Sequence, residues 1–201
     1  MSQDDLSHLL TADELLHMAI EASNRERYDL SIAYLKQAMA KPEPLRHEIP
    51  FMLASQYAQI GMKAEAKQYF AQTITLAPQF DIAIFQLGLL QLFDADQAGA
   101  ELTFQQLDFL PPEHAINQFR VGMLALGRNE LAVAGEALRA GLATGLANAP
   151  LMAEMQRILG NIEKLQADAA AAPAETPVAA AEANTDTAPT EDHIFLSAYR
   201  E

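Results

Sequence analysis

The sequence predicts an all-α fold in which a unit of about 34 residues is repeated. A capping helix and a disordered tail are expected to follow the repeats. Two observations support this prediction. Apolar residues recur with helical spacing from Asp4 to about Ala172, and one pattern of small and large residues returns at a fixed interval. The chain has no Asn-Gly or Asp-Gly hairpin signal and few alternating β-branched runs, which argues against a sheet.

The first helix is predicted to begin just after Thr11. Thr11 and Glu14 form a Thr-x-x-Glu capping box, in which each side chain can satisfy a free backbone N–H group of the other residue. Residues 1–11 form a separate segment that lacks the basic and apolar regions of a secretory signal. No apolar run approaches the roughly 20 residues that cross a membrane. The sequence therefore predicts a soluble cytoplasmic protein.

The repeat becomes visible when the chain is compared with itself at a step of 34 or 35 residues. Small residues return at two positions of each unit, and a large apolar residue returns at a third. The first small position holds Ala19, Ala54, Gly88 and Gly122, the second holds Ser31, Ala66, Ala100 and Ala134, and the large position holds Leu35, Phe70, Phe104 and Leu138. We expect the small residues to let two helices approach closely, with the large residue filling the space between units. Pro78 and Pro112 are expected to stop the last helix of their units.

This pattern resembles the tetratricopeptide repeat, whose 34-residue unit is a helix, a turn and a second helix. The resemblance covers residues 12–148 and implies a superhelical array of about four helix-turn-helix repeats. The chain departs from the family pattern where the first repeat lacks a closing Pro in register. It departs again where the fourth repeat becomes irregular after Gly141. In this family the first helix of each unit lines a concave groove.

The resemblance implies that the groove of this chain is apolar. Ten residues at the groove-facing positions are predicted to bind a partner: Phe51, Ile82, Phe85, Leu89, Leu92, Phe93, Ile116, Phe119, Met123 and Leu126. Family members that clamp the carboxylate of a chaperone's C-terminus place Lys, Asn and Arg at such positions, which argues against that role here. An apolar groove suits a hydrophobic peptide or an amphipathic helix of another protein. The alternative is that these side chains pack against one another.

A further amphipathic helix is predicted over residues 149–167. Its apolar residues fall on one stripe: Met152, Met155, Ile158, Leu159, Ile162 and Leu165. Repeat arrays need a terminal element that covers the last unit, so we expect a capping helix. A helix that forms a dimer is the alternative interpretation.

The end of the chain differs in composition from the repeats. Residues 168–190 are mostly Ala, Pro, Glu, Thr and Asp, which is typical of a disordered linker. Residues 191–201 then return to apolar character with Ile194, Phe195, Leu196 and Tyr199. We expect these four side chains to form a short binding motif. The motif could dock in the chain's own groove, in the groove of a second copy, or on another protein, and a tail without a role is the remaining possibility.

Composition narrows the classes of function. The net charge is −14, with 27 acidic and 13 basic side chains, which argues against nucleic acid and anionic membranes as partners. The chain has no Cys, so thiol catalysis, disulfides and Cys-ligated zinc are excluded. The five His residues have no metal-ligand spacing, and no Gly-rich phosphate loop is present. We therefore expect no enzymatic activity, no cofactor and no metal.

The function predicted from these observations is that of an adaptor or chaperone-like protein. It would bind an apolar segment of another protein in the concave groove, and its own tail could plug that groove. The small acidic chaperones of bacterial type III secretion translocators resemble it in size, charge and groove character. Two alternatives stay open. One is a homo-oligomeric structural scaffold, and the other is a regulatory subunit whose HIFLSAYRE tail docks onto a partner.

Overall fold

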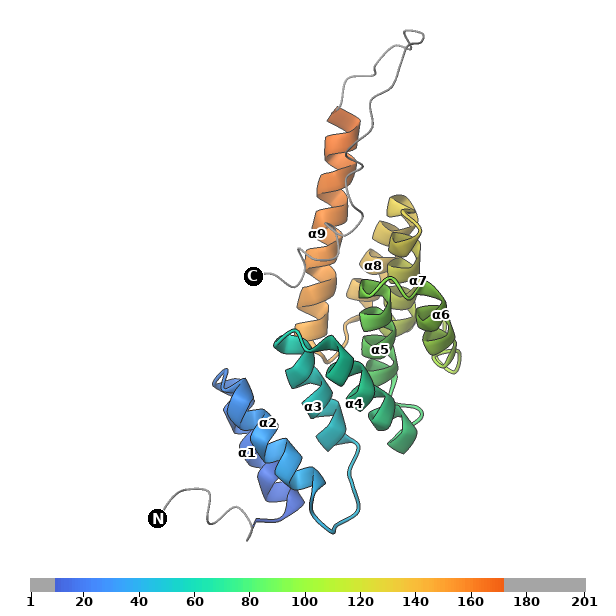
Figure 1. Ribbon diagram of the computed structural model, residues 1–201. Coiled ribbons are helices and arrows are strands. Elements are labelled where there is room, and N and C mark those ends of the chain that lie inside the picture. Colours follow the sequence, from blue (N-terminus) through green and yellow to red (C-terminus); the bar gives the residue numbers. More distant parts are fainter. Residues whose placement is uncertain (1–9, 172–201) are drawn as a thin grey trace, which may run out of the picture. The chain divides into compact units, whose positions relative to one another are not determined.

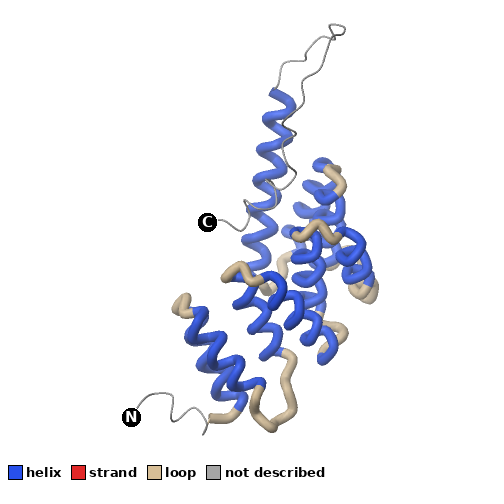
Figure 2. The backbone as a smooth tube through the Cα atoms, viewed as in Figure 1, coloured by secondary structure: helices blue, strands red, loops and turns tan. Residues whose placement is uncertain are grey.

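The computed structural model describes residues 10–171, and every regular element within them is an α-helix (Figures 1 and 2). The predicted all-α class is confirmed. The expected tail motif with Ile194, Phe195, Leu196 and Tyr199 lies outside the described residues, as does most of the expected linker. The helices are α1 Ala12–Asn24, α2 Tyr28–Met39, α3 Glu48–Gln59, α4 Lys63–Leu76, α5 Asp81–Phe93, α6 Gln97–Gln105, α7 Ala115–Gly127, α8 Leu131–Thr144 and α9 Ala149–Ala171.

The helices pair in chain order. The most extensive contacts join α1 to α2, α3 to α4, α5 to α6 and α7 to α8. Successive pairs are linked by contacts of α2 with α3 and of α4 with α5, and α9 packs on α8. The chain divides into two compact units, Met1–Asp108 and Phe109–Glu201. The first unit contains α1 to α6, and the second contains α7 to α9.

The turn inside each helix pair has the same backbone conformation four times. One residue of each turn has a positive φ: 58° at Glu26, 79° at Gly61, 57° at Ala95 and 60° at Asn129. The next N–H group donates to the carbonyl five residues back, in the bonds Arg27 to Ala22, Met62 to Tyr57, Asp96 to Gln91 and Glu130 to Ala125. This left-handed turn closes the end of a helix by satisfying its free carbonyls. The turns lie 35, 34 and 34 residues apart (61 − 26, 95 − 61, 129 − 95), so the backbone repeats at the sequence period.

Close helix crossings explain the small residues of the repeat. Ala19 and Ser31 are fully buried where α1 crosses α2, and the Ser31 hydroxyl donates to the Ala19 carbonyl at 2.9 Å. Gly88 meets the Phe104 ring where α5 crosses α6, and a Cβ added at Gly88 would lie 2.7 Å from Cδ1 of that ring. The small residues therefore set the distance between the helices, as the sequence predicts.

Two helix ends agree with the sequence-based predictions: the start of α1 at the Thr11 capping box and the end of α4 before Pro78. The capping box at α1 is formed, because the Glu14 N–H donates to Oγ1 of Thr11 at 3.2 Å and the Thr11 N–H donates to Oε2 of Glu14 at 2.8 Å. Helix α4 ends at Leu76, two residues before Pro78, as expected.

The prediction for Pro112 is wrong. Helix α6 ends at Gln105, seven residues before that proline. The chain continues in tighter turns, in which the N–H groups of Gln106, Leu107 and Asp108 each donate to the carbonyl three residues back. Leu107 is fully buried. We infer that α6 ends where Leu107 turns into the core, and that the missing N–H group of Pro112 plays no part in ending it.

Helix α9 packs on α8 where the sequence predicted a capping helix, and it continues to Ala171, beyond the predicted end at 167. Four of the predicted stripe residues are buried: Met155, Ile158, Leu159 and Ile162. Met152 and Leu165 are half-buried. An ion pair between Arg139 of α8 and Glu163 of α9, at 2.9 Å, lies beside the apolar contact.

Candidate partner-binding surface

The structure buries most of the residues that were predicted to line a groove. Seven of the ten are less than 9% exposed: Phe85, Leu89, Leu92, Ile116, Phe119, Met123 and Leu126. Phe51, Ile82 and Phe93 are half-buried. The sequence predicted that Phe85 and Met123 would face the groove and Phe104 the core, but all three are in the core. Whether any of the ten binds a partner stays a prediction.

Contacts inside each helix pair account for part of this burial. The Phe85 ring lies 5.7 Å from the Phe104 ring, centroid to centroid, across the pair α5 and α6. In the second unit the Phe119 ring lies against Gly141 of α8, where a Cβ would be 2.5 Å from Cε1 of the ring. A side chain as long as Phe on the first helix therefore reaches the second helix. Filling this space contributes to packing, so these residues have a structural role.

Three aromatic residues of the first unit remain partly accessible and contact one another. We call His47, Phe51 and Phe80 the aromatic cluster. The Phe51 and Phe80 ring centroids are 4.8 Å apart, and those of His47 and Phe80 are 5.2 Å apart in an edge-on arrangement. Phe51 also reaches the buried ring of Phe70, at 5.8 Å. The cluster is thus attached to the core while part of its surface stays open.

The local backbone fixes the position of Phe80. Phe80 occupies the N-cap position of α5, and its carbonyl accepts from the N–H groups of Ala83 at 3.1 Å and Ile84 at 3.2 Å. Its own N–H donates to the Ala77 carbonyl at 3.0 Å, which closes the turn around Pro78. Ile82, one of the predicted partner-binding residues, follows two positions later and is half-buried. The turn between repeats therefore holds an aromatic ring beside the start of α5.

Charged side chains lie next to the aromatic cluster. Arg46 pairs with Asp13 of α1 at 2.7 Å and with Glu48 of α3 at 2.8 Å. The hydrogen bond from Arg46 lowers the pKa of Glu48 below its ordinary value. His47 Nδ1 lies 3.5 Å from Glu48. These groups are half-exposed, so they form a polar edge at the start of α3 and not a buried site.

A second group of charges joins neighbouring repeats of the first unit. Asp94, at the end of α5, accepts from Lys67 at 2.6 Å and from Lys63 at 3.3 Å, both on α4. Burial alone would raise the pKa of Asp94, but the two lysine hydrogen bonds and charges outweigh it and lower the pKa. The pairing stabilises the packing of α4 against α5.

Sequence reasoning missed Arg46, His47 and Phe80 as members of a surface. None of them occupies a groove-facing position of the repeat, because they lie in the turns before α3 and α5. The available signal was the aromatic residue two positions after Pro78.

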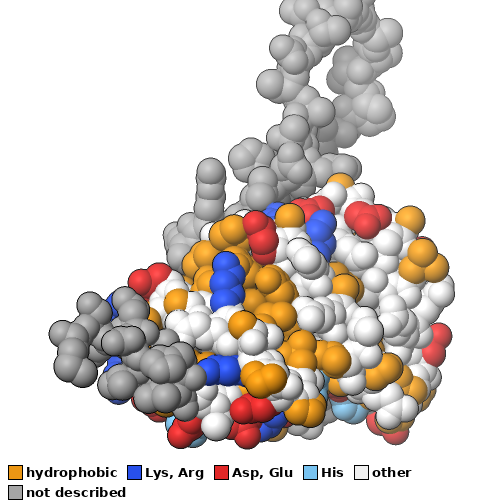
Figure 3. Space-filling view, turned by 60° about the horizontal axis from the view of Figure 1, so that its bottom comes forward, with side chains coloured by type: hydrophobic (Ala, Val, Ile, Leu, Met, Phe, Trp, Pro, Cys, Tyr) orange, Lys and Arg blue, Asp and Glu red, His pale blue; other side chains and the backbone are white. Residues whose placement is uncertain are grey.

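In the space-filling view, hydrophobic side chains gather in a band with Lys and Arg beside it and Asp and Glu toward its edge (Figure 3).

Other kinds of site receive little support from the described part of the chain. Among residues 10–171, no three His, Cys, Asp or Glu side chains come together as metal ligands. None of the helices in that range is both long and apolar enough to cross a membrane.

Four helical pairs with identical left-handed turns, small residues at the crossings and a covering helix define a tetratricopeptide-repeat type of fold. No protein-family model matches the chain, and no curated protein matches it either. Among solved structures, the chain is similar to "MamA 41-end" from Desulfovibrio magneticus RS-1, with a TM-score of 0.57 and 18% identity. That likeness covers 78% of this chain and 86% of the other. A second similar structure is the MamA RS-1 ArsTM double mutant, with a TM-score of 0.55 and 16% identity over 78% of this chain and 97% of the other. At this identity the likeness supports the fold, and it agrees with the resemblance found in the sequence.

Proposed function

We propose that the protein is a non-enzymatic interaction scaffold that binds an apolar segment of another protein at the aromatic cluster and Ile82. The observation that supports the proposal is the incomplete burial of rings that are otherwise held firmly in place. Phe51 rests on the buried Phe70, and Phe80 is fixed by the N-cap of α5. Aromatic side chains that are already ordered lose little conformational entropy on binding, so they make efficient anchors.

The chemistry around the cluster indicates the kind of partner. The proposed centre consists of the Phe51 and Phe80 rings with Ile82, and His47 joins Arg46 and Glu48 at the polar edge. An apolar centre with a polar edge is the usual composition of a protein–protein contact. A short helix or peptide with one or two large apolar side chains would fill the centre, and polar groups at its ends would meet the charged edge.

This proposal keeps part of the groove predicted from the sequence. Phe51 and Ile82 stay in the binding surface, and Phe93 is a half-buried candidate farther along α5. The seven buried residues are assigned to stability instead. The proposal includes no catalytic step, because the sequence has no nucleophile motif, phosphate loop or metal-ligand spacing that would suggest one.

The test is a peptide selection that does not require the natural partner. A random peptide library on phage is selected against the full chain, and the affinity of the best peptide is measured for three proteins. Ile82→Asp is expected to weaken binding about tenfold or more, which corresponds to about 1.4 kcal/mol. The matched control is Leu102→Asp on α6, whose side chain is 66% exposed and distant in sequence. Thermal unfolding of both variants is measured to check that they are folded at the temperature of the binding assay.

The outcomes separate the proposal from a general affinity for apolar surfaces. Selected peptides rich in Phe, Leu or Met that bind wild type and Leu102→Asp equally, and Ile82→Asp weakly, support the proposal. Equal loss of binding in both variants, or selected peptides without apolar residues, would show that the aromatic cluster is not the binding surface.

A further inference from the structure

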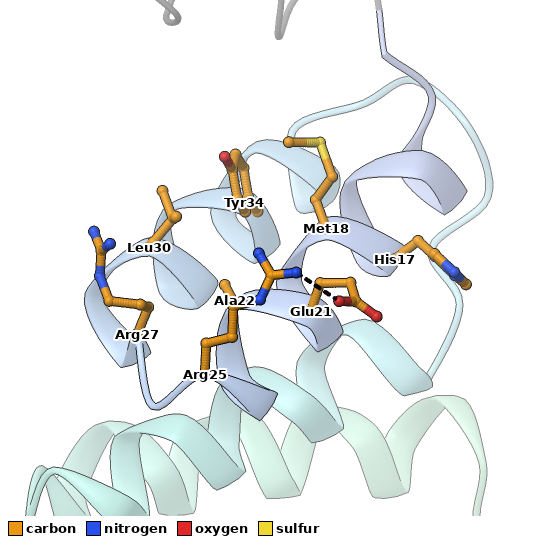
Figure 4. Close-up of a pocket in the computed structure, with 8 residues that line it drawn as sticks. All are labelled: His17, Met18, Glu21, Ala22, Arg25, Arg27, Leu30 and Tyr34. Atoms are coloured by element: carbon orange, nitrogen blue, oxygen red, sulfur yellow. Dashed lines mark hydrogen bonds and ion pairs between the residues drawn. The ribbon is translucent and has the colours of Figure 1, made fainter.

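A hollow of about 240 Å³ lies between α1 and α2, and none of the residues that line it belongs to the aromatic cluster (Figure 4). Its apolar residues are Met18 and Ala22 of α1 with Leu30 and Tyr34 of α2, and we call these four the floor. Charged and polar residues surround the floor: His17, Glu21, Arg25 and Arg27. Met18 is 37% exposed.

The position of Met18 is covered in the second repeat. A step of 35 residues takes Met18 to Leu53, which is 0% exposed, whereas Ala22 and its counterpart Tyr57 are both buried, at 6% and 5% exposed. The segment that covers Leu53 and Tyr57 includes α2, which precedes α3 in the chain and packs on it. Lys36 of α2, for example, lies 5.6 Å from the centroid of the Tyr57 ring. In repeat two, part of the cover is therefore the last turn of α2, which precedes the first helix of the repeat.

In the first repeat, a step back of 35 residues takes residues 36–44, the last turn of α2 and the turn after it, to residues 1–9, with the sequence MSQDDLSHL. Its apolar residues include Leu6 and Leu9, which match the floor in character. Its charged residues are Asp4 and Asp5, both acidic. A leucine and aspartate segment is therefore complementary to a hollow that combines an apolar floor with guanidinium groups.

The two arginines beside the floor are available for carboxylates. Arg25 lies 3.4 Å from Glu21 and Arg27 lies 3.5 Å from Asp29, and the arginine side chains are 76% and 60% exposed. Such long, exposed ion pairs contribute little, so exchanging or sharing them costs little. The residues around the floor include two Arg and one Glu, whereas the whole chain has a net charge of −14. The hollow is thus a place where an acidic segment meets positive charge.

The length of the segment is sufficient. The described chain begins at Leu10, which packs against the core beside the start of α1. Because a helix rises 1.5 Å per residue, Met18 and Arg25 lie about 9 and 20 Å along α1 from Ala12. Nine residues span up to about 30 Å when extended. Tethering also gives such a segment an effective concentration on the order of millimolar, which favours it over a free ligand.

We propose that residues 1–9 fold back along α1 and cover the hollow, with their leucines on the floor and their aspartates beside Arg25 and Arg27. The segment would then cover the exposed side of the pair α1 and α2. A second apolar and acidic peptide could enter the hollow only by displacing it.

The experiment uses the full chain and its lack of cysteine. A single Gln3→Cys substitution carries a nitroxide label, and the backbone amide signals of the ¹⁵N-labelled protein are recorded before and after reduction of the label. The amides of Met18 and Leu30 are expected to lose most of their intensity while the nitroxide is active. The amide of Leu102 on α6, in the third helix pair of the same unit, serves as the reference that should keep its intensity.

Two further samples decide between the possible occupants. Labelled, isotope-free chains mixed with unlabelled ¹⁵N chains should leave Met18 and Leu30 intact, and a loss of intensity there would mean that a second copy fills the hollow. The double variant Arg25→Glu and Arg27→Glu should restore the Met18 and Leu30 signals in the singly labelled chain, whereas Arg128→Glu should not. Full intensity at Met18 and Leu30 in the singly labelled wild type would overturn the proposal.

Discussion

The substitution Gly88→Ala tests whether close helix packing requires the small residue of the third repeat. A Cβ at this position would lie 2.7 and 2.8 Å from Cδ1 and Cζ of the Phe104 ring. That ring also packs on Phe85 and is buried, so it cannot move away freely. Overpacking of this kind typically costs about 1–3 kcal/mol. Replacing Gly by Ala inside a helix returns about 1 kcal/mol of helix propensity, so the expected net loss of stability is about 0–2 kcal/mol.

A second substitution, Gly160→Ala, measures the contribution of helix propensity without a new contact. Gly160 lies inside α9, and nothing stands within 4 Å of the position that its Cβ would take. Gly160→Ala is therefore expected to stabilise the protein by about 0.5–1 kcal/mol. Because both variants make the same exchange in a helix, the difference between them isolates the contact with Phe104, at about 1–3 kcal/mol.

Urea unfolding followed by circular dichroism measures both variants, and an unchanged m value indicates that the unfolded state is comparable. A third variant, Gly88→Ala with Phe104→Leu, shortens the ring that the new methyl group meets. We expect Phe104→Leu to cost less in the Gly88→Ala background than in wild type, because residues in contact are coupled. If Gly88→Ala stabilises the protein as much as Gly160→Ala, the close approach of α5 and α6 is wrong.

Three other predictions follow from the contacts. Phe85→Ala should destabilise the protein by roughly 3–5 kcal/mol in urea unfolding, as expected for a buried ring, whereas Leu102→Ala should change stability by less than about 0.5 kcal/mol. Asp94→Asn should cost about 0.5–1 kcal/mol at neutral pH. Since folding lowers the pKa of Asp94, this contribution is present above its ordinary pKa of 3.8 and is lost as the pH falls below it, so the two proteins should converge in acid unfolding curves. Gly61→Ala places a side chain at a φ of 79°, and a loss of about 1 kcal/mol is expected; an unchanged midpoint would contradict the left-handed turn.

The repeat architecture could be predicted because its physical causes are local or periodic. Ala19 and Gly88 are small wherever two backbones must approach, and this requirement recurs with each unit. Thr11 and Pro78 act on the few residues beside them, so their effect on a helix end can be recognised without knowing the fold. Pro112 was misleading because Leu107 enters the core before the proline is reached.

The exposed surface could not be predicted in the same way. Ile82 and Phe85 both occupy groove-facing positions on one helix, yet the first is half-buried and the second is fully buried. The difference depends on Phe104, which lies 19 residues further along the chain than Phe85 and brings its ring to within 5.7 Å of it. Phe80 joins the surface from a turn, where no helical period applies.

The sequence by itself determined the helical class, the repeat length and the small residues at each crossing, because these follow from spacing along the chain. Only the tertiary structure decided which apolar side chains close the core and which remain accessible beside Arg46 and at Met18. Periodicity shows that a helix has an apolar face, but what covers that face is a neighbouring segment whose reach and side-chain size are fixed only when the helices pack.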